Sequence, residues 1–276
     1  MGLLFAFFLL TFAVTWACFY ATLTMSHGSD ITLSMRLVLL VGTFAPSFVA
    51  VALSALQGAP ELKRLLSRVF QWQVPGRWYL FALGYMAILK IVVAFAARLL
   101  AGSWPHVGWT PVAMILAGIV ISTPFQAGEE IGWRGFALPR LANYIGFSGA
   151  SVVVGGIWAL WHLPLFFLAG TDTYGQAFPA WALGVTAVSV AFAWLYTHTE
   201  GSLFITMLMH SVANNLPHFD PMPASNTAGV FSLHAGTVLW LTTAVLWIPA
   251  VYFLIRMPAS EVPLRRANVA SGFASH

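Results

Sequence analysis

The sequence predicts an all-α polytopic membrane protein, a bundle of about eight transmembrane helices. Three observations support this class. The chain has 276 residues, of which 59% are hydrophobic and only 7% charged. Its mean hydropathy is +0.83. Apolar stretches long enough to cross a bilayer recur along it, separated by short polar connections. A soluble domain carries about 25% charged residues, so this chain could not cover a water-facing surface.

The apolar stretches define the expected elements in order. A membrane-spanning helix needs about 17–25 predominantly apolar residues. Stretches near this length cover residues 3–25, 36–56, 78–100, 110–141, 147–168, 179–197, 202–216 and 235–255. The first begins almost at Met1 without a basic segment or a small-residue cleavage site, so we expect a retained helix rather than a signal peptide. The fourth is interrupted by polar residues, and the seventh is short and polar.

The domain organisation follows from the same pattern. We expect one integral membrane domain over residues 1–276, with a motif-bearing core at about 111–216 and a polar cytoplasmic tail at about 257–276. The single cysteine, Cys18, lies inside the first apolar stretch, so an intramolecular disulfide framework is excluded.

The basic residues predict the orientation. Most of them lie between the second and third stretches, at the end of the fourth, or after the eighth: Lys63, Arg64, Arg68, Arg77, Arg134, Arg140, Arg256, Arg265 and Arg266. By the positive-inside rule both termini are cytoplasmic, as an even number of spans requires. We expect the protein to lie in the cell (inner) membrane, in contact with lipids. The net charge of +4 comes mostly from basic loop residues, so we interpret it as a signal of membrane orientation and expect no nucleic-acid partner. The segment 61–77 is predicted to form an amphipathic helix on the cytoplasmic face.

Two adjacent carboxylates stand out in the stretch FQAGEEIGWRG, residues 125–135. Glu129 and Glu130 are the only carboxylates inside an apolar stretch. An ionisable group at membrane depth costs at least roughly 2.5–3.5 kcal/mol, so it tends to be paired or functional. Arg134 follows Glu130 at i,i+4, the spacing of a structural ion pair on one helix face. Glu129 points about 100° away from this pair, which favours catalysis or transport.

Two histidines and an amide lie in other apolar stretches. They are His162 in WALWHLPLF, and His210 and Asn214 in FITMLMHSVANN, spaced i,i+4 on one helix face. A glutamate in a low-dielectric site can act as a general base on water, and imidazole and amide groups can donate to an oxyanion. Glutamate with two histidines could equally hold zinc, although no H-E-x-x-H motif is present. The alternative is interhelical hydrogen bonding without chemistry.

The ordered motifs resemble a known family. The pattern E-E-x-x-x-R at residues 129–134, an aromatic residue four before a histidine at Trp158 and His162, and H-x-x-x-N at residues 210–214 are similar to the motifs of the CPBP (CAAX protease and bacteriocin-processing, or Abi) intramembrane proteases. This family includes the type II CAAX prenyl endopeptidases. Many members have Phe where this chain has Trp158, and we expect no chemical consequence of that departure.

The resemblance implies roles for these residues. Glu129 would activate a water that His162 helps to hold, and His210 and Asn214 would stabilise the oxyanion. Glu130, Arg134 and Trp158 would support the site. Family descriptions differ on metal dependence. We expect no obligatory cofactor, and zinc, if bound, would be held by Glu129, His162 and His210. The implied activity is endopeptidase cleavage of a membrane-associated or lipidated protein or peptide.

Two other functions fit the pattern. One is a transporter that uses Glu129 and the histidines as a proton or cation relay. The other is a non-catalytic membrane scaffold, such as a bacteriocin immunity protein. Catalysis also makes a structural demand, since straight helices would place Glu129 nearer the cytoplasm than His162. The two meet only if the fourth span continues towards Leu141, or if Pro124 or Pro164 breaks a helix. We therefore expect a long or tilted fourth span with Arg134 sheltered from lipid.

Overall fold

The computed structural model describes residues 1–26, 31–102, 104–106, 109–217, 229–233 and 236–257, and these contain helices and no strand. The α-helices are α1 (Gly2–Ser26), α2 (Leu33–Leu56), α3 (Ala59–Ser67), α4 (Gly76–Ala101), α5 (Val112–Ser122), α6 (Ala127–Glu130), α7 (Leu138–Trp161), α8 (Phe178–His198), α9 (Leu203–Asn215) and α10 (Thr237–Arg256). Short 3₁₀ turns are η1 (Arg68–Phe70), η2 (Thr123–Gln126) and η4 (Leu163–Phe167), and η3 (Ile131–Ala137) is a π-helix. The predicted tail lies beyond the described residues, apart from its first residue.

The all-α polytopic prediction is confirmed. All eight predicted stretches are helical, with boundaries that differ by a few residues in most cases. Six helical stretches in the described part of the chain are long and apolar enough to cross a membrane. The number is six because Val112–Phe167 forms one stretch of 56 residues and because α9 has only 13 residues.

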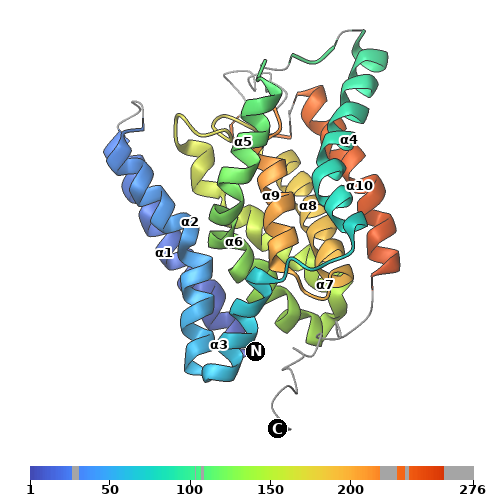
Figure 1. Cartoon of the computed structure of the whole chain (residues 1–276). Coiled ribbons are helices and arrows are strands. Elements are labelled where there is room, and N and C mark those ends of the chain that lie inside the picture. The colour runs from blue at the N-terminus through green and yellow to red at the C-terminus, as the bar shows by residue number, and fades with distance from the viewer. Residues whose placement is uncertain (27–30, 103, 107–108, 218–228, 234–235, 258–276) are drawn as a thin grey trace.

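The bundle is organised around α8 (Figure 1). This helix packs against α7, α9 and α10, and most of its small and apolar residues are buried. The hairpin of α1 and α2 lies on the other side of the molecule, where α2 contacts α6 and η3. Helix α4 packs on α9 and α10, and α5 packs on α9. The short α6 and the π-helix therefore lie between the hairpin and the central helices.

The fourth predicted span is a long, irregular helix, as the catalytic hypothesis required. It runs from Val112 to about Ile145 through α5, η2, α6, η3 and the first turns of α7. Pro124 lies in the 3₁₀ turn η2, where its missing N–H interrupts the regular helical hydrogen bonds. The chain changes direction at Gly146, whose φ of 69° is accessible mainly to glycine. Arg134 is 1% exposed, so the expectation that it is sheltered from lipid is confirmed.

Pro46 inside α2 leaves one backbone carbonyl without its helical donor, and a side chain of a neighbouring helix supplies a donor instead. A proline has no N–H to donate to the carbonyl four residues earlier, which here belongs to Gly42. The hydroxyl of Thr15 in α1 donates to this carbonyl oxygen at 2.7 Å. The same hydroxyl accepts a hydrogen bond from the indole N–H of Trp161 at 2.8 Å. One buried threonine thus connects α1, α2 and α7.

Glycines let α2 approach the π-helix closely. A Cβ atom placed on Gly132 would lie 2.5 Å from Cβ of Pro46 and 2.7 Å from its carbonyl carbon. A Cβ atom on Gly128 would lie 2.7 Å from the ring of Phe44. Small residues at helix interfaces permit this proximity in membrane bundles. The backbone on either side of Glu129 is therefore held in place by its close contact with α2.

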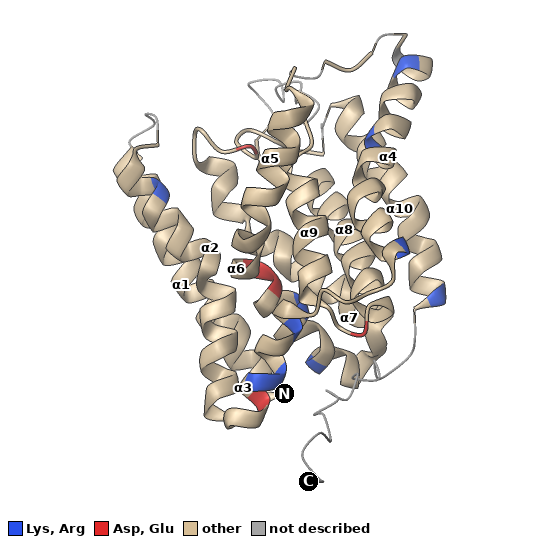
Figure 2. Cartoon of the chain, in the orientation of Figure 1, with Lys and Arg blue, Asp and Glu red and all other residues tan. Residues whose placement is uncertain are grey.

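The predicted amphipathic helix at residues 61–77 is shorter than expected. Helix α3 ends at Ser67, η1 ends at Phe70, and the chain is non-helical until α4 begins at Gly76. Pro75, which cannot continue a helix that precedes it, stands just before α4. Glu61 in α3 accepts a hydrogen bond from Arg140 at 2.5 Å, which attaches the segment to α7. Lys and Arg gather around α3 and at the same end of the molecule (Figure 2).

Candidate active site

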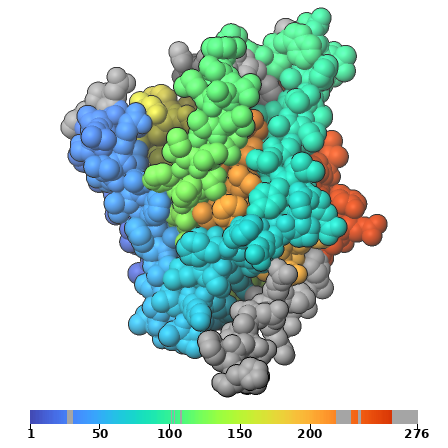
Figure 3. Space-filling model, viewed as in Figure 1, coloured from blue at the N-terminus to red at the C-terminus, as the bar shows by residue number. Residues whose placement is uncertain are grey.

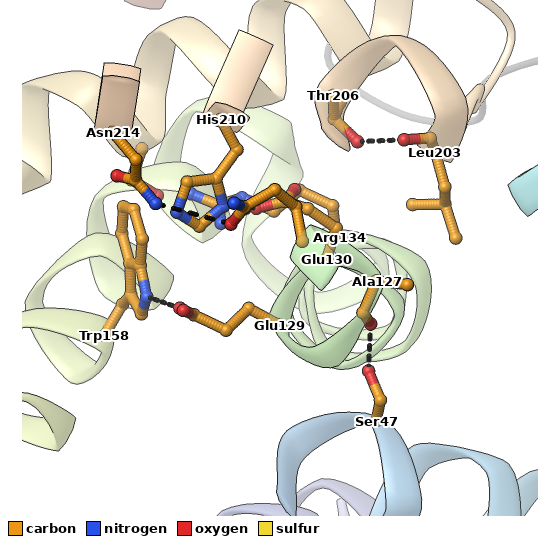
Figure 4. Close-up of polar contacts among 12 residues, drawn as sticks. Ser47, Ala127, Glu129, Glu130, Arg134, Trp158, Leu203, Thr206, His210 and Asn214 are labelled. Carbon is orange, nitrogen blue, oxygen red and sulfur yellow. Dashed lines mark hydrogen bonds and ion pairs between the residues drawn. The ribbon is translucent and has the colours of Figure 1, made fainter. Parts of the chain in front are cut away.

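The four predicted catalytic side chains come from three helices and meet in the middle of the bundle. Glu129 lies in α6, His162 caps the C-terminus of α7, and His210 and Asn214 lie one turn apart in α9. Glu129 is 7% exposed and His210 is 4% exposed, whereas Asn214 is exposed and His162 is half-buried. Figure 4 shows the carboxylate of Glu129 facing the nitrogen of the Trp158 indole, with His210 and Asn214 near the upper end of that ring in this view. The sequence hypothesis required this convergence.

Trp158 is the residue that connects the members of this site. Its indole N–H donates to Oε2 of Glu129 at 2.7 Å. Its ring centroid lies 5.5 Å from that of His162 and 5.5 Å from that of His210, and both contacts are edge-to-face. The expectation that Trp in place of Phe has no chemical consequence did not consider this hydrogen bond. A phenylalanine keeps an aromatic ring but has no N–H to donate.

Glu130 and Arg134 form the predicted ion pair in full burial. Nη1 of Arg134 donates to Oε1 of Glu130 at 2.7 Å, and the two side chains are 1% and 0% exposed. The guanidinium carbon lies 4.4 Å from the ring centroid of Trp158 and 4.6 Å from that of Phe192. Two aromatic faces thus flank the buried cation, and such contacts can contribute about 2 kcal/mol when desolvated.

The hydrogen bonds of the histidines define their tautomers. Nδ1 of His210 lies 2.8 Å from Oε1 of Glu130, and Nδ1 of His162 lies 2.8 Å from the carbonyl oxygen of Trp158. Carbonyl and carboxylate oxygens only accept, so each Nδ1 carries a proton and donates. In both neutral rings Nε2 therefore holds the lone pair. Glu130 links Arg134 to His210, which extends its predicted supporting role.

Local backbone irregularities position these groups. Helix α7 ends at Trp161 because Pro164 follows in η4, and the carbonyl of Trp158 is left for the ring of His162. The π-helix η3 directly follows Glu130 and carries Arg134. Single π-turns inside helices occur frequently at functional sites. Nothing in the apolar periodicity indicated this π-helix.

Gln126 is a site residue that the sequence reasoning missed. Its Oε1 accepts a hydrogen bond from Nδ2 of Asn214 at 3.4 Å, and the residue is 8% exposed. Gln126 stands one turn before Glu129 and Glu130 in FQAGEEIGWRG, so an uncharged polar side chain in an apolar stretch was the available signal. The bond directs the Asn214 amide towards the helix that carries Glu129.

A metal centre is not supported by the arrangement of the described side chains. Glu129, His162 and His210 were the candidate zinc ligands. Within the described ranges no three His, Cys, Asp or Glu side chains gather closely enough to hold a metal ion. Nδ1 of each histidine has an oxygen partner, so only Nε2 of each ring would be left to bind a metal. We therefore derive no chemical step through a metal.

Comparison with known proteins identifies relatives. Residues 104–216 match the family described as type II CAAX prenyl endopeptidase Rce1-like. A CAAX prenyl protease 2 from Methanococcus maripaludis is 25% identical over 227 residues, which cover 75% of this chain and 81% of the relative. The matched region contains all four predicted catalytic residues. The chain is thus a CAAX-protease-like enzyme of the membrane, a peptidase related to the type II CAAX prenyl endopeptidases of the CPBP family.

Proposed function

We propose that this protein hydrolyses a peptide bond of a membrane-associated or lipidated protein, with Glu129 as the base that activates water. The observation that carries the proposal is the convergence of Glu129, His162 and His210 around Trp158, from motifs on three helices. The prenylated CAAX-type substrate class is supported by the names of the relatives.

The free oxygen of Glu129 provides the site for the water. Oε2 accepts from Trp158, whereas Oε1 has no hydrogen-bond partner among the described residues. A water at Oε1 can pass a proton to the carboxylate as its oxygen attacks the scissile carbonyl. Nε2 of His162 can accept the other proton of that water in a hydrogen bond. Glu129 then returns the proton to the amine that leaves, so the enzyme is regenerated.

The oxyanion of the tetrahedral intermediate needs donors on the opposite side of the carbonyl. The amide of Asn214 supplies an N–H, and His210 supplies Nε2–H when its ring is protonated. Glu130 accepts from the other nitrogen of His210 at 2.8 Å and so holds the ring in place.

Access to the site fits a substrate that arrives from the bilayer. Asn214 is exposed on the last turn of α9. In the space-filling view, part of α9 is visible at the surface between α5 and α4 (Figure 3). A peptide attached to a lipid could therefore reach the oxyanion donors from this side.

Glu129→Gln is the direct test. Glutamine has nearly the same shape but cannot take a proton, so cleavage should fall by about 10²–10⁴-fold while the fold is kept. The measurement compares peptide termini in membranes that contain equal amounts of wild type or variant, with and without a chelator. Glu200→Gln is the matched control, because Glu200 is an exposed carboxylate outside the site.

Each outcome assigns a function. Termini that appear with wild type and Glu200→Gln but not with Glu129→Gln support the proposal. Loss of these termini with chelator would require a metal in the mechanism. Identical termini in all membranes, with folded proteins, would overturn the proposal in favour of a scaffold. Dependence on an ion gradient in vesicles would instead indicate a transporter.

A further inference from the structure

We infer that Trp158 is a positioning residue for the general base: its indole N–H holds one carboxylate oxygen of Glu129, so that the other oxygen faces the attacking water. This inference deepens the proposed function and rests on it. It assigns to this tryptophan a role that an aromatic ring alone could not perform.

The geometry supports a directed hydrogen bond. The indole nitrogen has one proton and no acceptor capacity, and it lies 2.7 Å from Oε2 of Glu129, with both residues buried. Bonds from a donor to a charged carboxylate are shorter and stronger than neutral ones. Glu129 has no ion-pair partner among the described residues, unlike Glu130. Trp158 is therefore the only described side chain that donates to this carboxylate.

The position of Trp158 is itself firmly determined. The guanidinium of Arg134 lies on its ring, and the rings of His162, His210 and Phe192 surround it. A carboxylate on a flexible side chain gains most from a donor that cannot move with it. The rigid indole selects one rotamer of Glu129 and leaves Oε1 directed away from the donor. The bond also excludes Oε2 from competing for the water.

Trp158→Phe separates the hydrogen bond from the ring. Phenylalanine keeps an aromatic face for Arg134 and the histidines but removes the N–H. We expect kcat to fall by about ten- to a hundredfold, a part of the contribution of general-base catalysis. We expect KM to change less than about threefold, because the lost N–H is bonded to the base, Glu129. The probe is an internally quenched peptide that spans a cleavage site found in the comparison of termini above.

Trp247→Phe is the matched control. Its indole N–H donates to the carbonyl oxygen of Leu183 at 3.1 Å, so this variant also loses one indole hydrogen bond. The residue lies in α10 and is half-buried, away from the site. Its kcat should remain within about twofold of wild type, because no site residue loses a partner.

The outcomes distinguish this inference from the proposed function. A low kcat with nearly unchanged KM in Trp158→Phe alone supports it. Wild-type kinetics in Trp158→Phe, with Glu129-dependent cleavage intact, would overturn it and leave the proposed function standing. An absence of Glu129-dependent cleavage in wild type would overturn the proposed function itself.

A second measurement tests the hydrogen bond even if Trp158→Phe loses activity by misfolding. Thermal stability is compared among wild type, Trp158→Phe, Glu129→Leu and the double variant. If the two side chains share a hydrogen bond, the second substitution should cost less after the first, because the partner is already lost. Additive losses would contradict the bond and, with it, the inference.

Discussion

At the residue scale, the site combines relations within one helix with hydrogen bonds between helices. The i,i+4 spacing of Glu130 and Arg134 predicted their ion pair, and the H-x-x-x-N spacing predicted that His210 and Asn214 share a helix face. The bond from Trp158 to Glu129 and the bond from Asn214 to Gln126 join residues 29 and 88 positions apart. Such contacts depend on how helices pack, which local spacing does not specify.

The buried ion pair gives a stability prediction at this scale. Arg134→Met should lower the free energy of unfolding by about 3–5 kcal/mol, because Glu130 would keep its charge without its partner. Arg64→Met removes a pair with Glu61 in which the arginine side chain is 52% exposed, and this should cost at most about 1 kcal/mol. Thermal unfolding in detergent checks both. Equal losses of stability in the two variants would contradict the claim that burial makes the Glu130–Arg134 pair the more important one.

At the element scale, apolar length and composition predicted every long helix, but not how the helices deviate from regularity. Proline positions indicated where η2 and η4 interrupt the helices around Glu129 and His162. The π-helix η3, which packs against α2, had no such indication in the sequence. The predicted helix at residues 61–77 was too long, because the amphipathic pattern continues past Ser67, where α3 ends, and gives no sign of the non-helical segment before Pro75.

The contact between α2 and η3 gives an element-scale prediction. Gly132→Ala should destabilise the protein by about 1–3 kcal/mol, because the new Cβ would overlap the backbone of Pro46. Gly156→Ala should be neutral or stabilising by up to about 1 kcal/mol, because its Cβ would meet no atom within 4 Å apart from the adjacent backbone of its own helix, and alanine favours helix. The midpoints of thermal unfolding should therefore move in opposite directions. A shared direction would argue against the close approach.

At the scale of the whole molecule, composition alone excluded a soluble protein, and the described helices agree. The all-α class followed from the apolar stretches. The exact number of crossings did not, because the chain from Val112 to Phe167 turns at Gly146 without leaving the helical pattern. Sequence also left the relative depth of Glu129 and His162 open, since depth depends on tilt and on helix breaks.

The distribution of Lys and Arg gives a prediction of sidedness for the whole molecule. In a Cys18→Ser background, Ser67→Cys in α3 should react with an impermeant maleimide only from the cytoplasmic side. Ser34→Cys at the start of α2 should react only from the opposite side. Both serines are exposed, so access is controlled by the membrane. Exchanged sides of labelling would reverse the predicted topology, and labelling of both positions from one side would refute it.

The shortness of α9 has a consequence for the lipid around the enzyme. Its 13 residues extend about 20 Å at 1.5 Å per residue, roughly 10 Å less than the hydrocarbon core of a typical bilayer. Lys90 of α4 donates to the carbonyl oxygens of Leu216 and Pro217 just beyond its end. A polar terminus at that depth favours local thinning of the bilayer and inward movement of headgroups. If Glu129 activates water as proposed, acyl-chain length should therefore alter how easily water reaches the site.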